Sequence, residues 1–144
     1  MLVEVKVKVA RVIDGKTRKR TETYLTDKEV FAQAEMEVIT CLVQEQEAGV
    51  VEDFEIQSLK ISPIKEVATQ FEGTNTFIAT LKDIWIDDDG NEKTLKYKVL
   101  LWANDLTQAN ARALQLSHQG YDMQVESIKQ VDYDYLIPTD NGNN

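Results

Sequence analysis

The segment Phe54-Glu55-Ile56-Gln57-Ser58-Leu59-Lys60 returns 69 positions later as Met123-Gln124-Val125-Glu126-Ser127-Ile128-Lys129. Apolar residues match at three positions, and the serine and the lysine are identical. In both copies the alternation of apolar and polar residues slips at the serine, because the apolar residues on either side of it stand three positions apart. A β-bulge produces such a slip in a strand. We therefore predict the same bulged strand twice in the chain.

A β-hairpin is predicted upstream of each copy. Residues 3–9 alternate valine with charged residues, which is the two-residue period of a half-buried strand. Asp14-Gly15 follows, and because Asp-Gly favours the positive φ of a tight turn, a return strand is expected from about Thr17 to Leu25. Residues 77–82 also alternate, reach Asp89-Gly90 and return through residues 95–101. Both halves of the chain thus begin with two antiparallel strands.

Each hairpin leads into a predicted helix. Thr26 and Glu29 have the spacing of a capping box, and Gly49 is the expected left-handed stop of the first helix. Asn104 is the expected N-cap and Gly120 the expected stop of the second. Apolar residues recur between these limits at helical spacing, as Phe31, Ala34, Val38 and Leu42 and then as Leu106, Ala109, Ala113 and Leu116.

These signals together predict an α+β fold of two tandem ββαβ repeats. Each repeat is a strand hairpin, a helix and a third strand, so that one helix packs on a mainly antiparallel sheet. We place the first repeat at 1–64, a polar connector at 65–75, the second repeat at 76–137 and a flexible tail at 138–144. The two repeats are expected to form one pseudo-symmetric compact unit.

Composition excludes several classes of protein. The 144 residues are 42% hydrophobic, but no stretch approaches the roughly 20 apolar residues of a membrane span. The alternating N-terminal residues have no apolar signal-peptide core, so we expect a cytoplasmic protein without a membrane partner. A single cysteine, Cys41, cannot form an internal disulfide, and with a single histidine, His118, it cannot build a zinc site.

The chain shows no motif that predicts catalysis, a cofactor or a metal. Its six glycines are dispersed, so no glycine-rich phosphate loop is present. The acidic stretch Asp87–Glu92 resembles a calcium loop at first, but with Gly90 in position six the loop would have Trp85 in position one and Lys96 in position twelve. Acidic ligands are needed at both places. We predict a solvated hairpin tip there and a protein that is not an enzyme.

Charge is distributed unevenly along the chain. The net charge is −9, yet residues 1–28 carry +4 and the rest carries −13. Four basic residues surround the first hairpin with a tyrosine nearby, and these are Lys16, Arg18, Lys19, Arg20 and Tyr24. The basic side chains could contact the phosphates of single-stranded nucleic acid or another polyanion while the aromatic ring stacks on a base. Alternatively, they only keep an edge strand soluble.

A protein partner is the second functional expectation. The acidic, aromatic segment 132–137 is similar to the acidic partner-binding tails of single-strand DNA-binding proteins, and it could equally be a last strand. The alternative function is therefore a protein–protein interaction module or inhibitor that uses sheet edges and exposed residues such as Trp85 and Trp102. An uncovered sheet edge could also pair with a second copy of the chain.

Several short motifs resemble an uncharacterised family, a domain of unknown function seen mainly in Bacteroidetes and in their phages and mobile elements. They are Glu4–Val7, Tyr24–Asp27, Gln33–Glu35, Lys60–Val67, Asp89-Gly90 with Glu92-Lys93, and Ala103–Leu106. The resemblance covers nearly the whole chain. It implies a phage or mobile-element context and assigns no catalytic or binding residue.

Overall fold

The computed structural model describes residues 2–118 and 123–136 as a mixed α+β protein with two helices and mostly antiparallel sheets. The described residues divide into two compact units. The first unit contains residues 2–62 and 133–136, and the second contains residues 63–118 and 123–132. In chain order the elements are β1 (Val3–Ile13), β2 (Lys16–Thr26), α1 (Phe31–Glu47), β3 (Val51–Ile61), β4 (Ile64–Ala68), β5 (Asn75–Ile86), β6 (Glu92–Ala103), α2 (Leu106–Leu116), β7 (Gln124–Val131) and β8 (Tyr135–Leu136).

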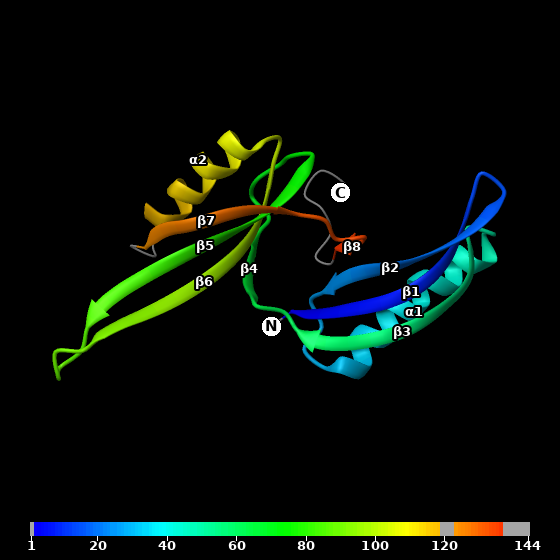
Figure 1. Ribbon diagram of the computed structural model, residues 1–144, viewed down its shortest axis with the longest axis horizontal. Helices are drawn as coiled ribbons and strands as arrows, with labels where there is room; N and C mark the ends of the chain where they lie inside the picture. Colours follow the sequence, from blue (N-terminus) through cyan, green and yellow to red (C-terminus); the bar gives the residue numbers. More distant parts are fainter. Residues whose placement is uncertain (1, 119–122, 137–144) are drawn as a thin grey trace. The chain divides into compact units, whose positions relative to one another are not determined.

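The first unit has a sheet of strand order β3-β1-β2-β8 with α1 on one face (Figure 1). The predicted Asp-Gly turn is confirmed, because Asp14 and Gly15 have φ values of 52° and 76° and join the antiparallel pair β1–β2. The alternating valines of β1 point into the core, where Ala34, Val38 and Leu42 of α1 meet them. Burial of these residues from both elements fixes the helix on the sheet.

Helix α1 starts differently from the prediction. Its N-cap is Val30, which makes no capping hydrogen bond through its side chain. Thr26 remains in β2, and its hydroxyl donates to the carbonyl oxygen of Val3 at 3.3 Å. The capping-box prediction is therefore wrong, because the strand ladder retains Thr26. At the other end Gly49 has the predicted positive φ, 79°, and lies just beyond the helix.

The second unit has a sheet of order β4-β6-β5-β7 with α2 packed on it (Figure 1). Its core consists of apolar residues of β5 and β6 against Ala109, Ala113 and Leu116 of α2. The N-cap of α2 is Asp105, one residue after the predicted Asn104, and its carboxylate accepts from the Gln108 amide at 2.8 Å. The Gln108 side chain in turn accepts from the Asn104 amide at 2.7 Å. The predicted stop, Gly120, lies outside the described residues.

The predicted bulge is present in both sheets. Lys6 pairs with Ser58 while Val7 pairs with Ile56, so Gln57 lies between two rungs of the β1–β3 ladder. In the other sheet Thr80 pairs with Ser127 and Leu81 with Val125. The irregularity occurs at the serine in each case, as the sequence indicates.

Each sheet has a fourth strand, and the sequence analysis did not predict β4, whereas β8 lies in the segment 132–137 for which a last strand was one alternative. Strand β4 follows β3 directly and runs parallel to β6 in the second unit, so part of the predicted connector 65–75 is a strand. Strand β8 follows β7 and runs parallel to β2 in the first unit, so residues 133–136, expected in the second repeat, belong to the first unit. Each unit thus completes its sheet with a strand that directly follows the third strand of the other.

Candidate functional site

The four basic residues singled out in the sequence lie together on the first half of β2. Lys16, Arg18, Lys19 and Arg20 are all exposed. Strand β1 pairs with one edge of β2 along its whole length, and β8 pairs with the other edge only at Tyr24 and Leu25. Among the described residues, no strand therefore pairs with this outer edge along the first half of β2. This half of the strand is therefore an open, positively charged sheet edge near the tip of the β1–β2 hairpin (Figure 1).

The basic residues do not all have the same surroundings. Side chains of a strand alternate between its two faces. Lys16, Arg18 and Arg20 share the face of the buried Tyr24, and Lys19 lies on the opposite face. Among the described residues, Lys16, Arg18 and Lys19 have no ion pair, whereas the guanidinium of Arg20 donates to the Glu22 carboxylate at 2.5 Å. Three of the four cations are thus available to an external anion.

Glu22 is the centre of a polar cluster that sequence reasoning misses. Its side chain is fully buried, and Arg11 holds it with two hydrogen bonds, one from Nε and one from Nη2 at 2.7 Å. Arg11 also donates to Glu45 of α1 at 2.6 Å. Two neighbours of Glu22 could have indicated its burial. Tyr24 lies on the same face of β2, Val7 stands opposite on β1, and both side chains are buried.

The cluster keeps Glu22 ionised. Burial by itself would raise the pKa of Glu22, but hydrogen bonds from Arg11, Tyr24 and Arg20 outweigh it and lower the pKa from its usual 4.5 to about 2. A general acid or base needs a pKa near the working pH. Glu22 therefore acts as a structural anion that fixes the two arginines and the C-terminal part of α1, which supplies Glu45.

Tyr24 does not lie where a stacking residue must lie. Its ring belongs to the core of the first unit and is 1% exposed, and its hydroxyl donates to Glu22 at 2.7 Å. Burial and the neighbouring Glu22 carboxylate both raise the pKa of Tyr24 above its ordinary value. The prediction that this ring stacks on a base is wrong, because the strand face that Tyr24 occupies is the one covered by α1.

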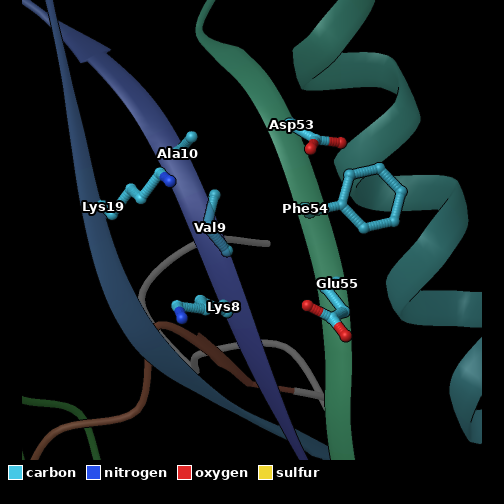
Figure 2. A pocket seen from close by; sticks show the side chains of 7 residues that line it. All are labelled: Lys8, Val9, Ala10, Lys19, Asp53, Phe54 and Glu55. Carbon is cyan, nitrogen blue, oxygen red and sulfur yellow. The ribbon is translucent and has the colours of Figure 1, made fainter.

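A shallow hollow lies on the sheet face opposite α1. Its volume is ≈ 140 Å³, and it is lined by Lys8, Val9, Ala10, Lys19, Asp53, Phe54 and Glu55 (Figure 2). Figure 2 shows the lysines on β1 and β2 and the two carboxylates on β3. Opposite charges so close together suit the hollow to a small polar group, whereas a polyanion meets attraction on the β2 side and repulsion on the β3 side.

The acidic C-terminal segment is largely built into the first unit. The backbone amide of Asp134 donates to the carbonyl oxygen of Thr23 at 2.9 Å. In return, the backbone amide of Thr23 donates to the carboxylate of Asp134 at 2.8 Å. The hydroxyl of Tyr133 donates to Glu4 at 3.0 Å, and burial and the nearby Glu4 carboxylate raise the pKa of Tyr133. These contacts occupy Tyr133 and Asp134, two of the groups that a partner-binding tail would present. The tail predicted at 138–144 lies outside the described residues.

Two other residues that were considered for chemistry, Asp87 and Cys41, can be placed in the described part of the chain. The carboxylate of Asp87 accepts from the amides of Asp89 and Asn91 and closes the β5–β6 turn. Burial raises the pKa of the Cys41 thiol, which disfavours the reactive thiolate. No group of three metal-ligating side chains occurs among the described residues. No helix within 2–118 and 123–136 is long and apolar enough to cross a membrane.

Comparisons with known proteins identify a family and name no function. No curated protein and no solved structure matches the chain. One family model, described as a domain of unknown function (DUF4494), matches residues 1–139. Because the match extends over nearly the whole sequence, the chain belongs to this DUF4494 family.

Proposed function

We propose that the protein is a non-enzymatic accessory protein that binds a polyanion, foremost single-stranded nucleic acid, through the first half of β2. The observation that carries this proposal is the open strand edge on which Lys16, Arg18 and Lys19 are exposed without an ion pair in the described residues. Backbone phosphates are the ligands that such cations contact, and these contacts supply sequence-independent affinity.

The proposed mode of binding uses cations and does not include the base stacking that was expected of Tyr24. Because Tyr24 is buried, base stacking is not part of the proposal. Lys6 and Lys8 are exposed on the open face of β1, and Lys6 stands opposite Thr23 and Lys8 opposite Thr21 of β2. They extend the positive surface away from the hairpin tip. Binding is therefore electrostatic, indifferent to base identity and strongly weakened by salt.

A titration with labelled oligo-dT, oligo-U and inorganic polyphosphate at 50 and 200 mM salt tests the proposal. Three phosphate contacts predict a fall in affinity of roughly tenfold or more between these salt concentrations. The triple variant Lys16→Ala, Arg18→Ala, Lys19→Ala is expected to abolish binding. Arg20 is left intact because it neutralises the buried Glu22.

A matched triple variant in the second unit is the control. Lys93→Ala, Lys96→Ala and Lys129→Ala remove the same charge from exposed positions elsewhere and should retain most of the binding. Equal losses in the two triple variants would mean that only the net charge matters. Absence of binding at low salt would refute the proposal outright.

A protein–protein interaction module or inhibitor is the second candidate. The specific observation in its favour is the set of exposed apolar residues near the β5–β6 turn, namely Ile84, Trp85, Ile86 and Leu95. Trp102, named from the sequence beside Trp85, is only 1% exposed and cannot contribute. A phage or mobile-element origin belongs to this second proposal. A cytoplasmic location and self-association through sheet edges are proposed for the protein under either function.

We further propose that the two halves arose by duplication of one ββαβ unit. The 69-residue offset between the two similar heptapeptides and the bulge at the same serine support this origin. A single-copy relative that folds as a homodimer, with each copy supplying the fourth strand of the other, would be its natural counterpart.

A further inference from the structure

The β5–β6 hairpin of the second unit is longer than the structure that covers it. Strands β5 and β6 pair as far as Ile86 and Glu92, whereas β7 accompanies β5 only to Lys82. The last part of the hairpin therefore extends beyond β7 and α2 as a two-stranded ribbon (Figure 1). Two-stranded ribbons have little stability of their own, so apolar side chains on them favour a covering partner.

The face of the ribbon that continues the core is apolar. Leu81 is buried in the core of the second unit, and Tyr97, its cross-strand partner, packs against that core. Because side chains alternate along a strand, Leu95 and Trp85 lie farther out on this same face. They are 48% and 45% exposed. The helix-side face of the ribbon is thus an apolar shelf, defined by Trp85, Leu95 and Tyr97, that α2 does not cover in the described chain.

The first unit shows what covers the corresponding place. Counted from the bulge, Trp85 corresponds to Arg11, and Tyr97 corresponds to Glu22. There α1, with 17 residues, reaches the hairpin and bonds Arg11 through Glu45. Helix α2 has only 11 residues. The shorter helix faces the more apolar hairpin, so no helix of the described residues covers the end of the β5–β6 hairpin.

The charge around the shelf indicates the chemistry of the missing cover. Residues 83–93 contain five acidic side chains and one lysine, a net charge of −4. Two charged residues share the shelf face, Asp83 directly opposite Leu95 and Lys93 directly opposite Trp85. The ammonium group of Lys93 forms an ion pair with Asp87 at 3.8 Å, and the surroundings of the shelf stay acidic. We propose that the shelf binds a basic amphipathic helix of a partner protein, with its apolar stripe on Trp85, Leu95 and Tyr97 and its cations toward Asp83 and the acidic turn. The proposal concerns the second unit and is independent of polyanion binding by β2.

Trp85 itself reports occupation of the shelf. The variant Trp102→Phe removes the buried second tryptophan, whose Nε1 has no hydrogen-bond partner in the described residues, and leaves Trp85 as the sole tryptophan. The probe is a synthetic Leu/Lys peptide designed as a basic amphipathic helix. Titration of the full chain with this peptide should shift the Trp85 emission to shorter wavelength, because the indole leaves water.

Two variants of the same ribbon distinguish a defined face from general attraction to an acidic protein. Leu95→Asp places a charge on the shelf, and Ile84→Asp places the same charge on the opposite face of the hairpin. We expect Leu95→Asp to weaken peptide binding by about tenfold or more, as for a buried apolar anchor, and Ile84→Asp to leave it nearly unchanged. Leu95→Ser is the milder replacement if the aspartate lowers the helix and strand content measured by circular dichroism.

Three results would overturn the proposal. One is the absence of an emission shift with the basic peptide. Another is equal weakening by Leu95→Asp and Ile84→Asp, which would show that the face is irrelevant. The third is equally strong binding of a Leu/Glu peptide with the same apolar pattern, which would show that the charge of the helix does not matter.

Discussion

The replacement Glu22→Gln removes one charge from the buried cluster of the first unit and retains its size. The fully buried carboxylate binds Arg11, Arg20 and Tyr24, and its pKa falls from 4.5 to about 2. A shift of this size corresponds to about 3 kcal/mol of stability that depends on the ionised form. The variant should therefore be less stable than the original chain by about 3 kcal/mol at neutral pH.

The pH dependence of this difference provides the sharper test. A carboxyl group whose pKa is lowered by folding stabilises the protein above its unfolded pKa and loses that contribution as the pH falls through the folded value. The contribution of Glu22 is thus complete above about pH 4.5 and is lost toward about pH 2. Below that pH a protonated Glu22 resembles glutamine. The stability gap between the original chain and Glu22→Gln should close over this interval.

Urea unfolding followed by far-ultraviolet circular dichroism at a series of pH values measures the gap. Other carboxylates titrate in both proteins, so their effects cancel in the difference. Glu55→Gln is the matched control, because Glu55 is an exposed carboxylate of the same sheet, and it should change stability by less than about 0.5 kcal/mol. A gap below about 1 kcal/mol at pH 7, or one that stays constant down to pH 2, would refute the assigned role of Glu22.

Two further substitutions test the packing of the second unit. Gly73→Ala places a Cβ atom 2.5 Å from the backbone nitrogen of Ala103, so we expect the free energy of unfolding to fall by about 1–3 kcal/mol. Thermal unfolding followed by tryptophan fluorescence measures this change. Unchanged stability would contradict the close approach of Gly73 to β6. Asp105→Ala removes the carboxylate that accepts from the Gln108 amide, so the free energy of unfolding in urea should fall by about 1 kcal/mol. Unchanged stability of this variant would contradict the capping role of Asp105.

Much of the fold was predictable because its signals are local. The turn at Asp14-Gly15 follows from the two residues that form it, and the buried valines of β1 follow from their alternation with charged residues. The bulges at Ser58 and Ser127 could be predicted from a slip in the alternation of apolar and polar residues along β3 and β7. The residues proposed to bind a polyanion could also be predicted from a local signal, because Lys16, Arg18 and Lys19 lie in one short basic segment.

The tertiary structure decided the features that depend on distant partners. Strands β4 and β8 are short, and they exist because the exposed edges of β6 and β2 offer hydrogen bonds to them, a condition that no local pattern expresses. The side chain of Tyr24 is buried because it packs in the core with residues of α1 and β1. The carboxylate of Glu22 stays ionised in this environment because Arg11 and Arg20 form ion pairs with it. Local residue order therefore determined where the chain turns and alternates, and the packing of distant segments determined which side chains remain accessible to a ligand.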